Sequence, residues 1–310
     1  MAPRIVRACR RGPVARVGGP IRFRRVSHDL PRTIDLMHLG VPHALGAHVH
    51  DGWIVDPGPQ RTVDRLLEAL GDEEPRGILL THIHFDHAGA TGELAARFPD
   101  AEIWVHERGA RHIADPTRLV ASARGVFGEA FDHLWGEVVP VPADRLRVLS
   151  GGETIGPWRV AYTPGHAKHH VAYLHEPTGV AFTGDVAGIR IDGGPAIPPT
   201  PPPDIDPPTW HRSIATVAAW KPRALAYMHF GVTSTDVEAH LADIDEALTR
   251  FTEQARTADN DAMTAFVREW VAARTDEDTV GSYYAAGPFE GNHGGLARYW
   301  QQVDEGKLSA

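Results

Sequence analysis

Short apolar runs alternate with helix-like repeats in the first third of the chain. The runs of residues 47–50 and 53–55 flank Asp51-Gly52, a pair typical of a tight hairpin turn. Between residues 60 and 70 apolar side chains recur at helical spacing, and Gly71 follows as a stop signal. The pattern predicts strands at 34–39, 47–50, 53–55, 77–81 and 102–106, helices at 60–70 and 91–98, and helix and loop over 107–135.

The second half repeats this alternation and then becomes helical. Residues 193–203 contain too much proline for a helix or an inner strand, which predicts a stiff surface loop followed by a helix from about 207 to 220. From residue 236 onward the apolar positions share helical faces. Strands are predicted at 158–162, 171–174, 180–182 and 224–227. Alternating strands and helices in each half predict sheets covered by helices.

Composition is that of an ordinary globular protein. Of 310 residues, 42% are hydrophobic and 23% charged. No apolar run approaches the roughly 18 residues that a membrane-spanning helix needs. Cys9 is the single cysteine, so a disulfide framework is excluded, which agrees with a reducing cytoplasm. We therefore expect a cytoplasmic protein.

Charge is unevenly distributed along the chain. Residues 1–33 carry nine arginines against the single Asp29, so the remainder is more acidic than the overall net charge of −9. The negative charge of the residues after 33 would repel the phosphate backbone of nucleic acid. The leader could be a targeting peptide or could bind an acidic partner. We favour a disordered basic extension, because prolines and glycines interrupt it and no apolar segment follows.

The segment Thr81-His-Ile-His-Phe-Asp-His-Ala-Gly89 concentrates residues that bind metals. His82, His84, Asp86 and His87 lie within six residues. In an extended segment side chains alternate, so His82 and His84 should point the same way and Asp86 can follow them. An open catalytic zinc ion uses about three protein ligands. Four ligands in one loop therefore suggest a second ion.

Three further residues of types that bind metals follow later strands. His166 comes after the strand at 158–162, Asp185 after 180–182 and His229 after 224–227. A single histidine or aspartate after a strand is usually structural or solvated. Four such strand exits, one of which carries the histidine loop, make a purely structural role for the set improbable. Rigid strands would also hold ligand geometry well.

These motifs together resemble the metallo-β-lactamase-fold hydrolase superfamily, on its glyoxalase-II-like side. The matching pieces are Val55-Asp-Pro-Gly58, residues 81–89, Thr163-Pro-Gly-His166, Thr183-Gly-Asp185 and His229-Phe-Gly231. They cover roughly residues 34–235. The resemblance implies an α+β fold, an αββα sandwich, with a metallo-β-lactamase-like catalytic domain at 34–235 after the leader at 1–33. We expect a helical C-terminal extension at 236–310 after this domain.

The resemblance also implies two divalent metal ions, zinc in the first place, with iron or manganese as alternatives. The first ion would be held by His82, His84 and His166. The second would be held by Asp86, His87 and His229, and Asp185 would bridge the two.

A hydrolytic mechanism follows from two such ions. A water shared by two divalent ions has its pKa lowered from about 16 towards 7, so a metal-bridging hydroxide is available at neutral pH. Asp86 would orient this nucleophile and carry its proton. Asp56 resembles the family's aspartate that orients a metal ligand without binding metal. Closing the turn at Pro57-Gly58 is an equally good interpretation of Asp56.

Other histidines and aromatic residues are weaker candidates. His170 is expected to pack in the loop or helix after His166. Tyr283, Tyr284, Phe289 and His293 could fold back over the site, although aromatic core packing is the better interpretation. Four histidines could line the mouth of the pocket: His43, His48, His50 and His169.

Several reactions share such a metal site, so the fold does not determine the substrate. The bridging Asp185 argues against a true β-lactamase, and His84 stands where the flavodiiron oxidoreductases have glutamate. Glyoxalase II itself is expected to bind glutathione through basic C-terminal helices, whereas residues 236–278 are acidic. Nuclease members need basic surface or an inserted domain, and the sequence shows neither.

The leading hypothesis is a dinuclear metal-dependent hydrolase of a small ester-type bond: a thioester, a lactone or a related ester. The first alternative is a persulfide dioxygenase-like oxidoreductase that uses one iron, and the second is a phosphodiester hydrolase. A metal-dependent binding module without activity is a further option. We expect a small-molecule substrate and neither a nucleic-acid nor a membrane partner. The oligomeric state is left open, with a homodimer as one candidate.

Overall fold

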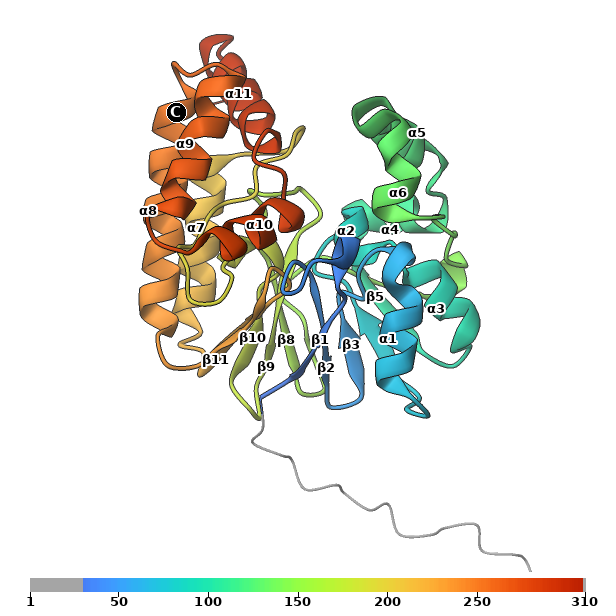
Figure 1. Ribbon diagram of the computed structural model, residues 1–310. Coiled ribbons are helices and arrows are strands. Elements are labelled where there is room, and N and C mark those ends of the chain that lie inside the picture. The colour runs from blue at the N-terminus through green and yellow to red at the C-terminus, as the bar shows by residue number, and fades with distance from the viewer. Residues whose placement is uncertain (1–29, 309–310) are drawn as a thin grey trace, which may run out of the picture.

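Two six-stranded mixed sheets lie face to face at the centre of the computed structural model, which describes residues 30–308 (Figure 1). In spatial order the first sheet contains β1 (Arg32–Asp35), β2 (Gly46–His50), β3 (Trp53–Val55), β4 (Gly77–Leu79), β5 (Glu102–His106) and β6 (Leu146–Leu149). The second contains β12 (Gly231–Thr233), β11 (Ala224–Tyr227), β10 (Val180–Phe182), β9 (Val171–His175), β8 (Trp158–Tyr162) and β7 (Thr154–Ile155).

Helices cover the outer face of each sheet, so the predicted αββα sandwich is confirmed (Figure 1). Those from the first half of the chain are α1 (Val63–Leu70), α2 (Phe85–Ala88), α3 (Thr91–Arg97), α4 (Glu107–Ala114), α5 (Thr117–Phe127) and α6 (Phe131–Trp135). Those from the second half are α7 (Pro207–Ala219), α8 (Val237–Ala255), α9 (Asn260–Ala272), α10 (Glu277–Ala286) and α11 (Gly291–Asp304). Short 3-10 turns are η1 (His38–Gly40), η2 (Gln60–Thr62), η3 (Gly128–Ala130), η4 (Ala143–Arg145) and η5 (Gly184–Ala187).

The hydrophobic core has three layers. Between the two sheets, Trp53 packs against Trp104 and Trp158, with ring centroids 4.8 Å and 6.4 Å away. A second cluster joins the first sheet to α1, α3 and α4, and includes Leu66 and Leu94. The third cluster joins the second sheet to α7 and to the four C-terminal helices. The strands therefore bury both faces, which explains why several of them are apolar throughout.

The hairpin predicted around Asp51-Gly52 is confirmed. His50 of β2 faces Trp53 of β3 in an antiparallel register, and both turn residues have positive φ, 47° and 81°. Asparagine, aspartate and glycine tolerate this backbone region better than other residues. The turn lies at the end of the sandwich from which β3 starts. Because β4 runs parallel to β3, the loop after β4 lies at the opposite end.

The structure departs from the strands expected from the sequence in two ways. The strand expected at 34–39 is wrong in its second half: β1 ends at Asp35, and η1 follows with left-handed residues on either side of His38. Three short strands, β6, β7 and β12, escaped the sequence analysis. All three lie at sheet edges, where one side of the strand is exposed and the apolar pattern is weak.

The proposed basic leader lies almost entirely outside the described residues, which begin at residue 30. Within residues 30–308, no helix combines the length and the apolar character needed to cross a membrane. The C-terminal segment from 237 to 304 consists of helices, as the periodicity predicted.

Candidate metal centre

Four strand exits meet at one edge of the sandwich. In the second sheet β8, β10 and β11 run in the same direction, so His166, Asp185 and His229 leave the same edge. In the first sheet β4 ends at Leu79, and His82 follows it. The carboxyl ends of parallel strands are the usual place for functional residues in such sheets, because loops can vary there while the strands stay rigid.

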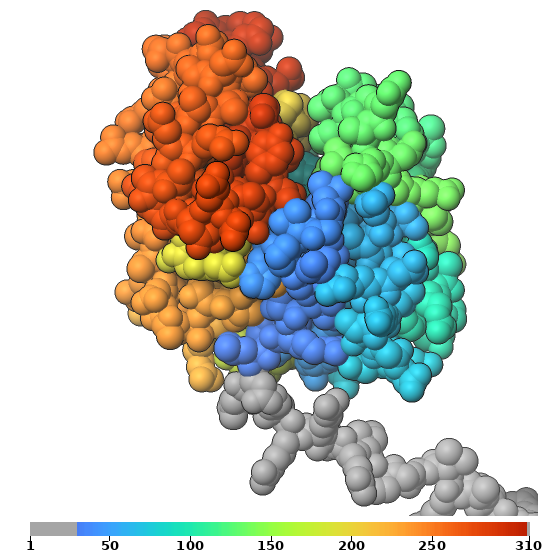
Figure 2. Space-filling model, viewed as in Figure 1, coloured from blue at the N-terminus to red at the C-terminus, as the bar shows by residue number. Residues whose placement is uncertain are grey.

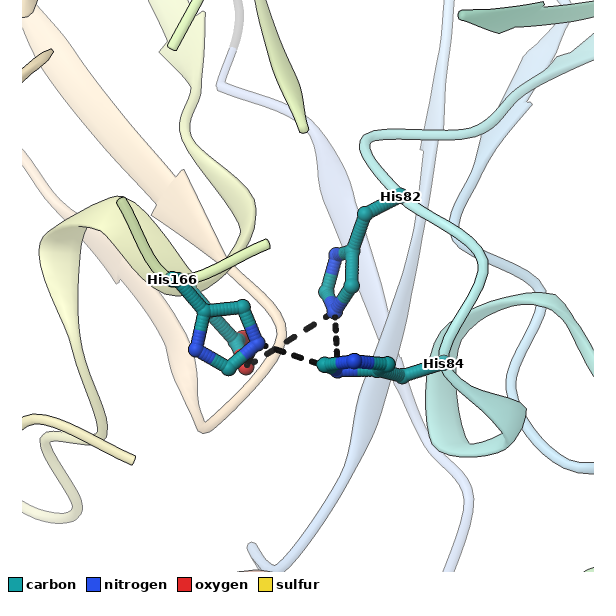
Figure 3. A group of neighbouring side chains, drawn as sticks. His82, His84 and His166 are labelled. Atoms are coloured by element: carbon teal, nitrogen blue, oxygen red, sulfur yellow. Dashed lines mark hydrogen bonds and ion pairs between the residues drawn. The ribbon is translucent and has the colours of Figure 1, made fainter. Parts of the chain in front are cut away.

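The first group of side chains contains His82, His84, His166 and Asp185. One ligand atom from each lies within 4.8 Å of the others. His84 Nδ1 is 3.0 Å from His82 Nε2 and 3.0 Å from His166 Nε2. Figure 3 shows the three rings converging on a common point. This is the geometry of a metal site formed by three nitrogens and one oxygen.

The second group contains Asp86, His87 and His229. His87 Nε2 lies 3.2 Å from His229 Nε2 and 3.7 Å from Asp86 Oδ2. We expected Asp86 to point the same way as His82 and His84 by strand alternation, and this expectation is wrong. The chain turns into α2 at Phe85, and this helical turn directs Asp86 towards His229 instead.

Asp185 lies between the two groups. Its Oδ2 is 3.2 Å from His166 Nε2, and its Oδ1 is 3.0 Å from His87 Nε2 and 3.4 Å from His229 Nε2. Each carboxylate oxygen therefore faces a different group. Oδ1 is buried and has no hydrogen-bond partner, which is costly for a carboxylate oxygen unless a cation is nearby.

A hydrogen-bonded chain orients two of the rings. Asp56 accepts hydrogen bonds from the Thr81 hydroxyl (2.6 Å), the Thr81 N–H (2.8 Å) and His87 Nδ1 (2.9 Å). Because the Thr81 hydroxyl donates to Asp56, its oxygen accepts from His82 Nδ1, 3.1 Å away. His82 and His87 therefore each carry a proton on Nδ1 and direct Nε2 at the cluster. Burial lowers the pKa of His87, but Asp185, Asp86 and Asp56 outweigh it and raise that pKa well above its usual value, so a proton can also occupy its Nε2.

His166 is oriented in the same way by the proline-rich loop. Its Nδ1 is 2.9 Å from the Pro199 carbonyl, which can only accept, so Nε2 carries the free lone pair. Three imidazoles thus direct Nε2 inward, and those of His82 and His166 are unprotonated. Such nitrogens repel one another unless a cation or a proton lies between them. The donor set therefore fits two metal ions.

Electrostatics differ between the two groups. Burial lowers the pKa of His82 and His166, and that of His84 to about 4, so these rings are neutral and ready to bind a metal. Burial also lowers the pKa of His229, but Asp185 and Asp86 outweigh it and raise that pKa to about 9. A cation entering the second group would take the place of such a proton.

His170, which was expected only to pack in the loop or helix after His166, contacts Asp185 and Thr163. Its Nε2 accepts a hydrogen bond from the Asp185 N–H (3.2 Å), and its Nδ1 lies 2.9 Å from the Thr163 hydroxyl. Gly184 has φ +48° and lies against Thr81 and His170. A Cβ at Gly184 would lie 2.5 Å from Thr81 Oγ1 and 2.6 Å from His170 Nε2. Only glycine allows this close approach without strain.

The other candidate residues lie in different parts of the structure. His169 lies beside the cluster, 5.6 Å from His84 by ring centroid, and accepts from the Ile83 N–H at 3.4 Å. His43 is partly exposed, pairs with Asp192 at 2.8 Å and stacks on Phe230.

His48 and His50 do not line the pocket mouth, contrary to one expectation. Both are buried, because β2 directs their rings at Phe182 in the core between the sheets. His50 also lies at the opposite end of the sandwich. Tyr283 and Phe289 are buried in the C-terminal core, as core packing predicted, Tyr284 is partly exposed, and His293 bonds to the Ala258 carbonyl.

Sequence reasoning missed Thr81 and His38. Thr81 links Asp56 to His82, and its place at the start of the histidine loop was a usable signal. His38 was assigned to a strand, although it is buried and lies near Asp86 and His229. No spacing in the sequence indicates that approach, which depends on the turn η1.

Comparison with known proteins agrees with this geometry. The family model described as the metallo-beta-lactamase superfamily matches residues 50–225, more than half of the chain. The Sulfurisphaera tokodaii protein ST1585, a metallo-beta-lactamase fold-containing protein, is 31% identical over 172 residues, which are 53% of this chain and 64% of the relative. The crystal structure of ST1585 has a TM-score of 0.64 at 24% identity, over 86% of this chain and 97% of that one.

Two further proteins carry more specific descriptions. A hydroxyacylglutathione hydrolase of Thermosynechococcus vestitus is 32% identical over 149 residues, 46% of this chain and 48% of the relative. TTHA1623, whose crystal structure is of a di-iron-bound form, has a TM-score of 0.50 at 25% identity over 68% of this chain and 97% of that one. The chain thus spans less than two thirds of the length of these sequence relatives.

Proposed function

The chain belongs to the metallo-beta-lactamase superfamily, and from that premise we propose that it is a dinuclear metal-dependent hydrolase of a small ester-type bond. The observation that carries the proposal is the position of Asp185, whose two oxygens face two separate groups of ligands. Each group offers one ion its own set of inward-pointing donors.

We assign the ligands as the two groups suggest. His82, His84 and His166 would hold one ion, and Asp86, His87 and His229 the other, with Asp185 between them. Imidazole and carboxylate ligands suit zinc, and also iron and manganese. The di-iron-bound form of TTHA1623 supports keeping iron among the candidates.

When bound, the two ions would polarise the scissile carbonyl and lower the pKa of a water molecule from about 16 towards 7. In this proposal Asp86 would take the proton of that water. Its side chain is 20% exposed, whereas those of His87 and His229 are buried. The proton can therefore pass from Asp86 to solvent or to the leaving group.

The substrate class we favour is a thioester, a lactone or a related small ester. The similarity to hydroxyacylglutathione hydrolase supports thioester chemistry. Glutathione itself fits less well, because most charged residues of the C-terminal helices are acidic. The acidic body likewise disfavours nucleic-acid substrates.

The test is a metal titration combined with a substrate panel. Metal-free protein is loaded with zinc, manganese or ferrous ions, and metal per chain is measured beside turnover of thioesters, lactones and phosphodiesters. We expect two ions per chain and turnover of one ester class. One iron per chain, with oxygen consumption when a persulfide is supplied and no hydrolysis, would establish the persulfide dioxygenase-like alternative. Turnover of phosphodiesters alone would establish the second alternative.

A further inference from the structure

The segment between β1 and β2 is held in a strained conformation beside the metal centre. Met37 and Leu39 both have positive φ, 48° and 55°, which is unusual for residues with large side chains. Asp35 stabilises the segment by accepting from the Met37 N–H at 2.9 Å and the His43 N–H at 3.2 Å. Strain of this kind is concentrated at functional sites, and here its result is the placement of His38.

The rings of His38 and Trp135 are stacked, and one nitrogen of each lacks a hydrogen-bond partner among residues 30–308. Their ring centroids are 5.7 Å apart with an interplanar angle of 9°. His38 Nδ1 and Trp135 Nε1 are both buried, and neither has a hydrogen-bond partner among residues 30–308. Buried polar atoms are nearly always bonded. Two unpartnered ones on adjacent rings indicate a place where a ligand supplies the missing partner.

The pair lies on the side of the second metal-ligand group. Asp86 and His229 lie near His38. Trp135 Nε1 carries no charge and can only donate a hydrogen bond. An uncharged donor near the Asp86 carboxylate suits a neutral oxygen acceptor better than an anion.

Apolar side chains surround this polar pair. Phe127 packs edge-on against Trp135, with centroids 5.5 Å apart. Leu39, Val126 and Phe127 are 37%, 69% and 36% exposed. On the other side α10 packs against η1. Figure 2 shows the surface hollowed between the C-terminal helices, in orange and red, and the α5–α6 segment, in green, with N-terminal residues in blue at its base.

We propose that this hollow binds the acyl part of the substrate: an apolar chain lies along Leu39 and Phe127, and an uncharged oxygen within that chain accepts a hydrogen bond from Trp135 Nε1 and contacts His38. The inference rests on the proposed ester hydrolysis and specifies its substrate. His38 and Trp135 are specificity residues in this account. The scissile bond itself belongs to the metal centre.

The experiment uses a series of esters with one leaving group. The metal-loaded protein is assayed with 4-nitrophenyl hexanoate, with analogues in which an oxygen replaces each chain methylene in turn, and with an analogue that ends in a carboxylate. We expect one oxygen position to lower KM about fivefold relative to hexanoate, as a single neutral hydrogen bond would. Trp135→Phe should remove that preference.

Two further variants separate recognition from folding. Trp270→Phe is the matched control, because its indole N–H is also buried and unpartnered but lies on α9. It should leave the preference intact. His38→Gln, which keeps a donor and an acceptor, should retain more of the preference than His38→Leu. Equal losses for hexanoate and the oxygen analogues would mean that the pair is structural, and the proposal would be overturned.

The remaining outcomes also decide the question. A wild-type protein with no preference anywhere in the series, or with a preference for the carboxylate, contradicts an uncharged oxygen acceptor. If no ester is hydrolysed at all, the proposed function fails, and the site is then tested separately. Calorimetry with the corresponding methyl ketones, which cannot be hydrolysed, should still show tighter binding of the oxygen-containing chain to wild type than to Trp135→Phe.

Discussion

Thr81 connects the buried carboxylate of Asp56 to two proposed metal ligands at once. Its hydroxyl donates to Asp56 and accepts from His82, while Asp56 also holds His87. Groups that orient metal ligands commonly change metal affinity by tenfold to a hundredfold when removed. A single hydroxyl should therefore affect both halves of the site.

Replacing that hydroxyl gives the first prediction. Thr81→Val keeps the shape but removes the donor to Asp56, so we expect metal affinity to fall about tenfold or more, measured by competition with a chelator. Thr81→Ser should restore most of it. An affinity unchanged in Thr81→Val would show that the chain from Asp56 through Thr81 does not orient His82.

The shared carboxylate gives the second prediction. Asp185→Asn keeps the volume but removes the charge between the two groups. We expect metal content to fall from two ions per chain to one or fewer, and kcat to fall at least about a hundredfold, in the range for lost electrostatic stabilisation. Metal analysis beside steady-state kinetics measures both. Two tightly bound ions in this variant would contradict the bridging role.

At the scale of elements, α7 supports the turn that carries His166. Ser213 donates to the Pro164 carbonyl at 2.5 Å, and Gly165 lies directly against Trp210. A Cβ at Gly165 would be 2.4 Å from Trp210 Cα, and φ there is +130°. The turn has no room to move away from the helix, so its position depends on that glycine.

The third prediction compares two glycines. Gly165→Ala combines backbone strain with a steric clash, whereas Gly152→Ala has strain alone, because φ is +106° and a Cβ would meet open space. We expect Gly165→Ala to lower the free energy of unfolding by at least about 2 kcal/mol more than Gly152→Ala, and to weaken metal binding. Urea unfolding and metal titration of both variants check this. Equal effects would mean that the clash is relieved.

The fourth prediction concerns acid stability and α8. His240 is buried, and burial lowers its pKa to about 4, although it bonds to the Ala187 carbonyl. Because the unfolded chain takes up the proton near pH 6.5 and the folded chain does not, this residue reduces stability as pH falls from 6.5 towards 4. The full effect is on the order of 3 kcal/mol.

His240→Leu should flatten that dependence. Its unfolding free energy should be lower than that of wild type at pH 8, where the Ala187 carbonyl loses its donor, and the difference should shrink or reverse at pH 5. Urea unfolding at the two pH values measures it, with His133→Leu on the exposed face of α6 as control. A difference that is constant with pH would contradict the buried neutral histidine.

Much of the sandwich could be predicted from sequence because its inner strands are short, apolar and bounded by turn residues. The strand exits that carry His166, Asp185 and His229 follow from that pattern alone. The direction of Asp86 could not be predicted, because the change from strand to α2 at Phe85 has no signal in spacing. The approach of His38 to Trp135 joins residues 97 positions apart and depends on left-handed backbone at Met37 and Leu39.

At the scale of the whole molecule, the C-terminal helices and the second sheet share one hydrophobic cluster. Leu241, Ile244 and Leu248 of α8 are buried in the same cluster as Leu225 of β11 and Val217 of α7. Burial of a leucine or isoleucine side chain contributes about 1.5–3 kcal/mol. The extension therefore supplies one outer layer of the sandwich.

The fifth prediction follows from that shared layer. A chain ending at residue 235 would expose the apolar faces of α7 and η5 that α8 covers. The free energy lost with several buried leucine-sized side chains is comparable with the 5–15 kcal/mol that stabilises a typical domain. We expect this chain to bind a hydrophobic dye and to lack a cooperative unfolding transition in calorimetry, whereas a chain ending at residue 304 should unfold like wild type. Cooperative unfolding of the shorter chain would show that residues 30–235 fold independently and that the helices are an accessory to the metal centre.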